Sequence, residues 1–225
     1  MCWRLCAIRR AFSHQEIQQR SVHGHGGFAG FKVEQVAGMF GHGKAADESD
    51  QRDQRGKTRR KHDRQQGDKL EAMGRVTFEQ IEAGPEHLPI LELMFRQRGA
   101  RFSEMGIRDP FCMAGIRRFY DSTIGTQSSL NVVLHVLRLD GEIVALRYNI
   151  AHGDRLFCLI SSMSTQPRLQ PGSPGKQCLL RVMQSVFDCG YRMFDMGAGL
   201  TDEKRHWCNV QVLVREFHVP LSPVG

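Results

Sequence analysis

The chain has 225 residues, of which 40% are hydrophobic and 24% charged, and its formal net charge is +7. This length suffices for one sizeable hydrophobic core. No run approaches the roughly 18 apolar residues of a membrane span, and the N-terminal residues lack the apolar segment of a signal peptide, so we expect a cytoplasmic protein without a membrane span. The seven cysteines are scattered and show no zinc-ligand spacing, which favours reduced thiols.

The positive charge is concentrated in the N-terminal third of the chain. Residues 1–75 contain 15 Lys and Arg against 9 Asp and Glu, whereas residues 76–225 contain 16 against 15. Residues 1–56 carry glycines at irregular spacing and show no sustained period of 2 or 3.6. We therefore predict that 1–56 is disordered or a non-native segment, and that its "HGHGG" is a flexible glycine-rich stretch rather than a metal site.

Residues 57–74 form a basic, polar stretch that predicts a helix towards its end, with Leu70 and Met73 as apolar anchors. Two interpretations of the basic run stay open. It is either a solvated helix face, which we favour, or a contact surface for nucleic acid. Because no aromatic residues for base stacking are interleaved with the charges, the sequence does not favour nucleic-acid binding.

From residue 75 onwards the pattern predicts regular elements in close succession. They are a short strand at 75–81, a helix within 84–106, a second helix within 109–125, and an antiparallel meander of strands at 131–139, 142–152 and 155–163. Asp140 and Gly141 form a strong hairpin signal, and Gly153 and Asp154 form a second one. The meander is therefore the centre of the predicted sheet.

The stretch "QPRLQPGSPGKQCLLRVM" at 166–183 leads from a loop rich in proline and glycine into an amphipathic helix. The apolar stripe of this helix recurs at i, i+3, i+4 and i+7: Leu179, Val182, Met183 and Val186. Gly190 is a typical helix stop, and "YRMFDMG" follows it as a strand. A strand, loop, helix and strand in this order predict that the last two strands are parallel.

The start of that helix is a candidate anion site. Ser173 is a good N-cap, and the N–H groups of Gly175, Lys176 and Gln177 would point out of the helix start. A helix start in water that binds nothing has the same pattern, so both interpretations stay open. The loop is not a Walker A motif, because its glycines are too close together and no Ser or Thr follows the lysine.

The segment "SPGKQCLL", followed after the helix by "FDMGAG" and "EKRHW", resembles the C-terminal catalytic domain of the CelD-type acetyltransferases. These belong to the GNAT superfamily and are related to FemAB-like transferases. The matching positions are Ser173, Pro174, Gly175, Asp195, Gly197, Gly199, Lys204 and Trp207. The resemblance covers 57–225, which we expect to be one C-terminally truncated domain. It implies a mixed α/β GNAT acyltransferase fold: a mostly antiparallel central sheet with one parallel strand–helix–strand unit and flanking helices.

The resemblance further implies transfer of an acyl group from acetyl-CoA to an amine of a small molecule or sugar, in cellulose or other polysaccharide biosynthesis. The parallel strands, at 155–163 and 191–196, would splay apart and hold pantetheine in the gap. The loop and helix start would hold the pyrophosphate through Ser173, Gly175, Lys176 and Gln177, with Arg168 of the loop as a further phosphate contact.

In this chemistry the amine attacks the thioester directly, so a base and oxyanion donors are needed rather than a nucleophilic side chain. Asp195 is the candidate base, or else a structural carboxylate that caps the glycine turn after it. Lys204 would contact the acceptor or a CoA phosphate, or else is an ordinary exposed lysine. Glu203 stands where relatives carry a tyrosine, and 1–56 does not resemble the additional N-terminal lobe of relatives. The alternative is therefore a catalytically inactive remnant or a partner-binding lobe.

Overall fold

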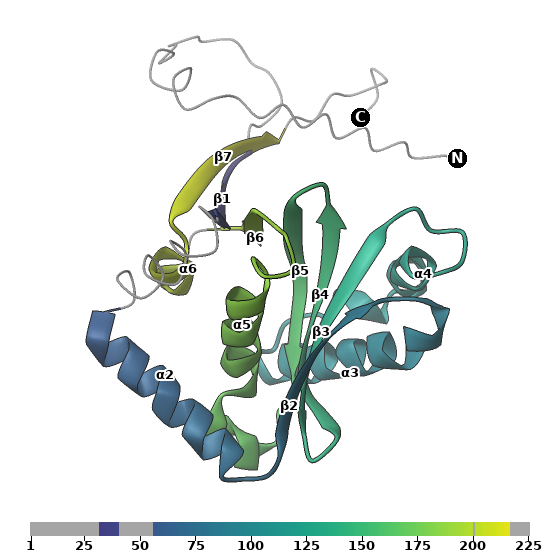
Figure 1. Cartoon of the computed structure of the whole chain (residues 1–225). Coiled ribbons are helices and arrows are strands. Elements are labelled where there is room, and N and C mark those ends of the chain that lie inside the picture. Colours follow the sequence, from purple (N-terminus) through teal and green to yellow (C-terminus); the bar gives the residue numbers. More distant parts are fainter. Residues whose placement is uncertain (1–31, 41–55, 200, 217–225) are drawn as a thin grey trace, which may run out of the picture.

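The computed structural model describes residues 32–40, 56–199 and 201–216, and it arranges them around one twisted sheet (Figure 1). The elements are β1 (Lys32–Phe40), α2 (Gly56–Glu71), β2 (Val76–Glu82), η2 (Pro85–His87), α3 (Leu88–Glu104), η3 (Pro110–Cys112), α4 (Ala114–Thr123), β3 (Asn131–Leu139), β4 (Glu142–His152), β5 (Arg155–Met163), η4 (Pro167–Gly172), α5 (Pro174–Ser185), β6 (Met193–Ala198), α6 (Asp202–Trp207) and β7 (Val210–Glu216). Within these ranges, no helix combines the length and the apolar character that a membrane crossing requires.

The strand order is β2-β3-β4-β5-β6-β1-β7, and β5 with β6 is the parallel pair among the described strands. The α3 and α4 helices cover one face of the sheet, α5 covers the other, and α2 runs obliquely along the side of α5 (Figure 1). This arrangement confirms the predicted fold class, including the parallel strand–helix–strand unit.

The predicted meander is confirmed with its boundaries, because its turns are encoded locally. Asp140 and Gly141 adopt φ values of 51° and 85°. A two-residue hairpin turn of type I′ requires a positive φ at both of its central residues. Gly153 adopts a φ of 58° in the second turn, and His152 then pairs with Arg155. Short turns fix the register of both hairpins.

The alternation of side chains along β3 and β4 divides the core between the two faces of the sheet. The cluster that includes α3 and α4 contains buried Leu91, Met94, Phe95, Phe111, Ile124, Val132, Leu134, Val136, Leu146, Tyr148 and Ile160. The cluster under α5 contains buried Val133, Leu156, Leu179, Leu180, Val182, Met183, Val186, Phe194 and Trp207. The predicted apolar stripe of α5 therefore faces the core.

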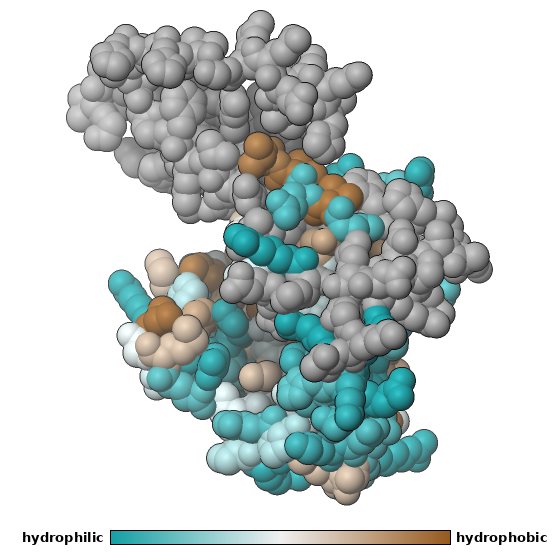
Figure 2. Space-filling model, turned by 90° about the vertical axis from the view of Figure 1, so that its left-hand side faces the viewer, coloured by the Kyte–Doolittle hydropathy of each residue, from teal (hydrophilic) through white to brown (hydrophobic). Residues whose placement is uncertain are grey.

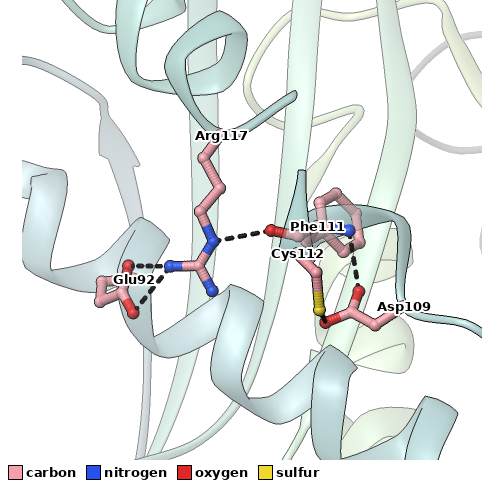
Figure 3. A network of polar contacts seen from close by, with 5 residues as sticks. All are labelled: Glu92, Asp109, Phe111, Cys112 and Arg117. Atoms are coloured by element: carbon pink, nitrogen blue, oxygen red, sulfur yellow. Dashed lines mark hydrogen bonds and ion pairs between the residues drawn. The ribbon is translucent and has the colours of Figure 1, made fainter. Parts of the chain in front are cut away.

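A polar network joins α4 to α3 on the first face (Figure 3). Nη1 of Arg117 donates to both carboxylate oxygens of Glu92, at 3.1 and 2.8 Å, and its Nε donates to the Phe111 carbonyl at 2.7 Å. Asp109 accepts the N–H of Phe111 at 2.8 Å and so caps η3. One guanidinium thus ties together two helices and the turn between them.

Close backbone approach fixes α2 against η4 and α5. A Cβ on Gly172 would lie 2.9 Å from Cβ of Leu70, and a Cβ on Gly67 would lie 3.0 Å from Oε1 of Gln177. Leu70 is fully buried, whereas most of the charged side chains along the described part of α2 are exposed. Figure 2 looks at the side of the molecule on which α2 lies, and hydrophilic residues dominate its lower part. This is the arrangement that the solvated-face interpretation expects.

The structure differs from the sequence prediction at Lys32–Phe40, which we expected to lack regular structure. This segment forms β1, which pairs antiparallel with β6 and with β7. Its pattern is irregular, and the register shifts between Val36 and Gly38, which obscures the period of 2. Its two partner strands lie more than 150 residues away in the sequence, so no local signal announces it. The rest of 1–56, including "HGHGG", lies outside the described residues, apart from Gly56 at the start of α2.

Candidate functional site

The parallel strands β5 and β6 separate soon after they begin. Their pairing covers Arg155–Met193, Leu156–Phe194 and Phe157–Asp195, and β6 then continues beside β1. Beyond Phe157, β5 pairs with β4 on one side, while no described strand pairs with its other edge. This is the predicted splay, although β6 spans Met193–Ala198 rather than 191–196. The splay presents open backbone groups of β5 to a ligand.

The α5 helix begins next to this open edge of β5. Ser173 takes the N-cap position, as predicted, but it adopts the left-handed conformation with a φ of 46°, and its side chain does not cap the helix. Its hydroxyl instead accepts a hydrogen bond from Nε2 of Gln66 at 2.8 Å. Strained backbone at a non-glycine residue is typical of ligand sites. The N–H groups of Gly175 and Lys176 find no acceptor within the described part of the chain.

The prediction for Gln177 is wrong in its geometry. Its N–H is not free, because it donates to the Ser173 carbonyl at 3.0 Å as part of the helix. Its side chain is buried and donates to the Asp63 carbonyl of α2 at 2.9 Å. The ammonium of Lys176 also lies towards α2, 3.6 Å from Oδ1 of the buried Asp63. The sequence prediction placed the N–H of Gln177 and the charge of Lys176 at the anion site, and it did not reveal that α2 packs against both side chains.

Arg168 lies away from the helix start. Its guanidinium is 3.6 Å from the Glu142 carboxylate at the beginning of β4, and its Nε donates to the side chain of Gln166 at 2.8 Å. Its side chain is 58% exposed, and it does not line the cavity described next. The structure therefore does not bring Arg168 together with Gly175.

A cavity of about 500 Å³ lies between the start of α5, the end of β5 and the C-terminal half of α3. This volume falls within the range of small-molecule sites. Its lining residues are Gln97, Arg98, Arg101, Glu104, Arg147, Ser161, Ser162, Met163, Ser164, Thr165, Gln170, Ser173, Pro174, Gly175, Lys176 and Leu179. Four of these side chains are cationic and one is anionic, so the wall favours an anionic ligand. Sequence reasoning missed the three arginines, because α3 and β4 gave signals only for their apolar positions.

Asp195 and Lys204 both bind the backbone turn at the end of β6, on the other side of the gap between β5 and β6. Asp195 is 7% exposed, and its Oδ1 accepts the N–H of Gly197 at 2.8 Å, which caps the glycine turn. Nζ of Lys204 donates to the carbonyls of Gly197 and Ala198 at 3.1 and 2.5 Å. A Cβ on Gly197 would lie 3.4 Å from the Cys158 carbonyl, so this turn lies beside β5 where the strands separate.

Thr201 caps α6 by accepting the N–H of Lys204 at 3.3 Å, and α6 thereby presents Lys204 to the turn. The Trp207 side chain is buried beside the α5 cluster, as a core or pocket-wall residue would be. Burial raises the pKa of the nearby Cys208 thiol to about 11, which keeps it neutral at pH 7. The side chains of Glu203 and His206 lie outside the described part of the structure.

The comparisons with known proteins agree with this fold. Residues 57–205 match a family model described as an acetyltransferase (GNAT) domain. A comparison with curated proteins gives no match.

Among solved structures, the chain is similar to that of FemX, with 10% identity and a TM-score of 0.52 over 79% of this chain and 59% of that one. It is equally similar, at 13% identity and a TM-score of 0.52, to a conserved protein of unknown function from Bacteroides thetaiotaomicron, over 82% of this chain and 60% of that one. A third match is an aminoglycoside acetyltransferase from an uncultured soil metagenomic sample, in complex with trehalose, at 14% identity and a TM-score of 0.44 over 65% of this chain and 97% of that one.

At sequence identities of 10% and 13%, the first two matches show a shared fold only. This chain spans about three fifths of the length of each of these proteins, 59% and 60%. The family match covers well over half of the chain and ends just after the β6 turn and Lys204. The chain therefore belongs to the family of acetyltransferase (GNAT) domains, which implies acyl transfer from a co-substrate of the acyl-CoA type.

Proposed function

We propose that this protein transfers an acetyl group from acetyl-CoA to an amine of a small molecule or sugar. The observation that supports the proposal most is the separation of β5 from β6 after Phe157, together with the start of α5, where the Ser173 side chain does not cap the helix and Gly175 lies against Met163 at the end of β5. The open edge of β5 offers hydrogen bonds to an extended amide-containing chain such as pantetheine. The N–H groups of Gly175 and Lys176 suit the pyrophosphate.

In this proposal the donor phosphates lie against Ser173, Gly175 and Lys176. Lys176 contributes charge while its ammonium lies near Asp63. Gln177 contributes by holding α5 against α2, since its side chain binds the Asp63 carbonyl. Arg168 contributes at most at long range, because it pairs with Glu142 outside the cavity.

The acetyl group would lie where β5 and β6 part, beside the turn that Asp195 and Lys204 hold. Asp195 is the proposed base for the attacking amine, and Lys204 keeps the turn in place through two carbonyls. The resemblance to CelD-type enzymes supports a sugar amine in polysaccharide biosynthesis as the acceptor. The scattered cysteines, which we expect to be reduced, are consistent with a cytoplasmic location.

The second candidate is a non-catalytic lobe that retains the fold. It is supported by the same polar contacts, because capping and clamping the β6 turn are structural roles that Asp195 and Lys204 fill without chemistry. Glu203 in place of the tyrosine of relatives supports it as well. The two candidates differ in whether the bound donor is consumed.

The test measures binding and turnover with the full chain. Calorimetry with acetyl-CoA measures binding, and release of the CoA thiol in the presence of a panel of amines and amino sugars measures transfer. Binding with amine-dependent thiol release supports the transferase, whereas binding without release for any amine supports the non-catalytic lobe. Absence of acetyl-CoA binding contradicts the donor site.

Gly175 offers a matched pair of variants for the helix start. A Cβ at this position would lie 2.8 Å from the flexible Sδ of Met163, so any substitution displaces that side chain. Gly175→Ala tests this steric effect alone, and Gly175→Asp adds a negative charge beside the phosphates. We expect Gly175→Asp to weaken acetyl-CoA binding far more than Gly175→Ala. Equal affinities of the two variants would contradict the phosphate position.

A further inference from the structure

We propose that Gln66 of α2 is a positioning residue for the start of α5. It holds Ser173 in the left-handed conformation, and it thereby prevents the serine from capping its own helix. The inference rests on the proposed function for the identity of the ligand, because it takes the start of α5 as part of the donor site. It gives a role to α2, although none of the described residues of α2 lines the cavity.

The α2 helix contacts the start of α5 on both sides of Ser173 in the sequence. Directly before it, a Cβ on Gly172 would lie 2.9 Å from Cβ of Leu70, so the two segments are close together. After it, Nε2 of Gln177 donates to the Asp63 carbonyl at 2.9 Å. The side chains of Leu70 and Gln177 are buried. The position of this turn is therefore set by interior contacts with α2.

Ser173 departs from the usual conformation of an N-cap residue. An N-cap serine normally has an extended backbone, and its hydroxyl accepts an N–H of the first helical turn. Here φ is 46° and ψ is 60°, and the side chain does not cap the helix. The hydroxyl accepts a hydrogen bond from Nε2 of Gln66 at 2.8 Å and donates to the Gln170 carbonyl at 3.4 Å. The left-handed conformation is unfavourable for a serine by itself, so the bond from Gln66 offsets part of its cost.

Without Gln66, the serine has a more favourable alternative. Its backbone relaxes to the extended region, and its hydroxyl accepts the N–H of Gly175 or Lys176, as an ordinary N-cap does. That bond occupies the same donors that a bound anion uses at a helix start. The helix would then cap itself in competition with the ligand. By binding the hydroxyl, Gln66 keeps these groups prepared in the free protein, which lowers the cost of binding.

The experiment uses the full chain and two measurements. Amide hydrogen exchange of Gly175 and Lys176, followed by NMR without ligand, reports whether Ser173 caps the helix. Calorimetry with CoA reports the affinity of the donor site. Gln66→Met keeps the length of the side chain and removes its N–H donor. Gln65→Met is the matched control, because it makes the same change at the adjacent, exposed position of α2.

A second background separates positioning from packing. We expect Gln66→Met to slow amide exchange at Gly175 or Lys176 and to weaken CoA binding about threefold to tenfold, whereas Gln65→Met should match wild type. Ser173→Gly supplies a residue that adopts the left-handed conformation readily and has no hydroxyl. In that background, Gln66→Met should change neither quantity. If Gln66 only packed α2 against α5, Ser173→Gly would give no such rescue.

The outcomes separate this inference from the proposed function. Equal amide exchange in wild type and Gln66→Met would overturn the inference, whether or not CoA binds. An equal loss of CoA affinity with and without Ser173→Gly would also overturn it, because Gln66 would then act by packing. If the exchange rates change as expected but the wild type does not bind CoA, the role of Gln66 holds and the proposed donor is wrong. Gln66→Ala, which needs less space, takes the place of Gln66→Met if that variant does not fold.

Discussion

Lowering the pH should destabilise this protein through one buried histidine, His135 of β3. Its imidazole is fully buried, stacks on Phe78, and lies 2.8 Å from Nδ2 of Asn149. Burial and, to a smaller extent, the positive charge of Arg147 together lower its pKa from 6.5 to about 4. The Asn149 amide donates to Nδ1, so the neutral ring carries its proton on Nε2, which lies 3.0 Å from Oε1 of Gln80.

The sign and size of the effect follow from linkage. As the pH falls below about 6.5, the unfolded chain binds a proton at this histidine, whereas the folded chain does not bind one until about pH 4. The free energy of unfolding that depends on a neutral His135 is therefore fully present above pH 6.5, and it is lost as the pH falls towards 4. A difference of roughly 2.5 pKa units corresponds to about 3 kcal/mol in total, of which about 2 kcal/mol is lost between pH 7 and pH 5.

The assay is urea unfolding, followed by circular dichroism, at pH 7 and pH 5. In His135→Gln the side chain is neutral at both pH values. The free energy of unfolding of this variant should therefore fall by about 2 kcal/mol less than that of wild type between pH 7 and pH 5. His152→Gln replaces an exposed histidine at the end of β4 and should behave like wild type. If wild type and His135→Gln lose the same free energy of unfolding, then His135 is not kept neutral by burial and the reasoning fails.

Three further substitutions test particular contacts. Asp195→Asn retains the oxygen that accepts the N–H of Gly197 but cannot take up a proton from the amine. The rate of thiol release should therefore fall by a factor of about 10² to 10⁴ while the thermal midpoint is unchanged. Full activity would show that Asp195 only caps the turn. Gly172→Ala should lower the free energy of unfolding by about 1–3 kcal/mol, because its Cβ would lie 2.9 Å from Leu70, and an unchanged urea midpoint would contradict the close packing of α2 on η4. Tyr148→Phe removes the hydroxyl 2.7 Å from Thr123 in the core and should cost about 1 kcal/mol in the same assay, whereas no loss would mean that the bond adds nothing to stability.

The sequence and the structure agree best where a signal lies within one turn or one helix. The meander boundaries follow from Asp140, Gly141 and Gly153, whose backbone conformations few residues adopt. The α5 stripe follows from helical periodicity, and the family motif follows from residues close together in the chain. The helix start was likewise predicted, although its N-cap serine binds Gln66 instead of capping α5.

The sequence by itself therefore determined most elements from α2 to β6, the hairpins and the parallel unit, and it predicted a donor site at the start of α5, whereas it did not predict β1, α6 or β7. Only the tertiary structure decided which side chains face that site. It turned Gln177 and Lys176 towards α2, across a separation of 114 residues for Gln177 and Asp63, and it brought Arg98 and Arg147 to the cavity instead of Arg168. It also placed β1 between β6 and β7. The physical reason is that turn conformation and periodicity act between near neighbours, whereas a side chain's direction and a strand's partners depend on segments that meet only after folding.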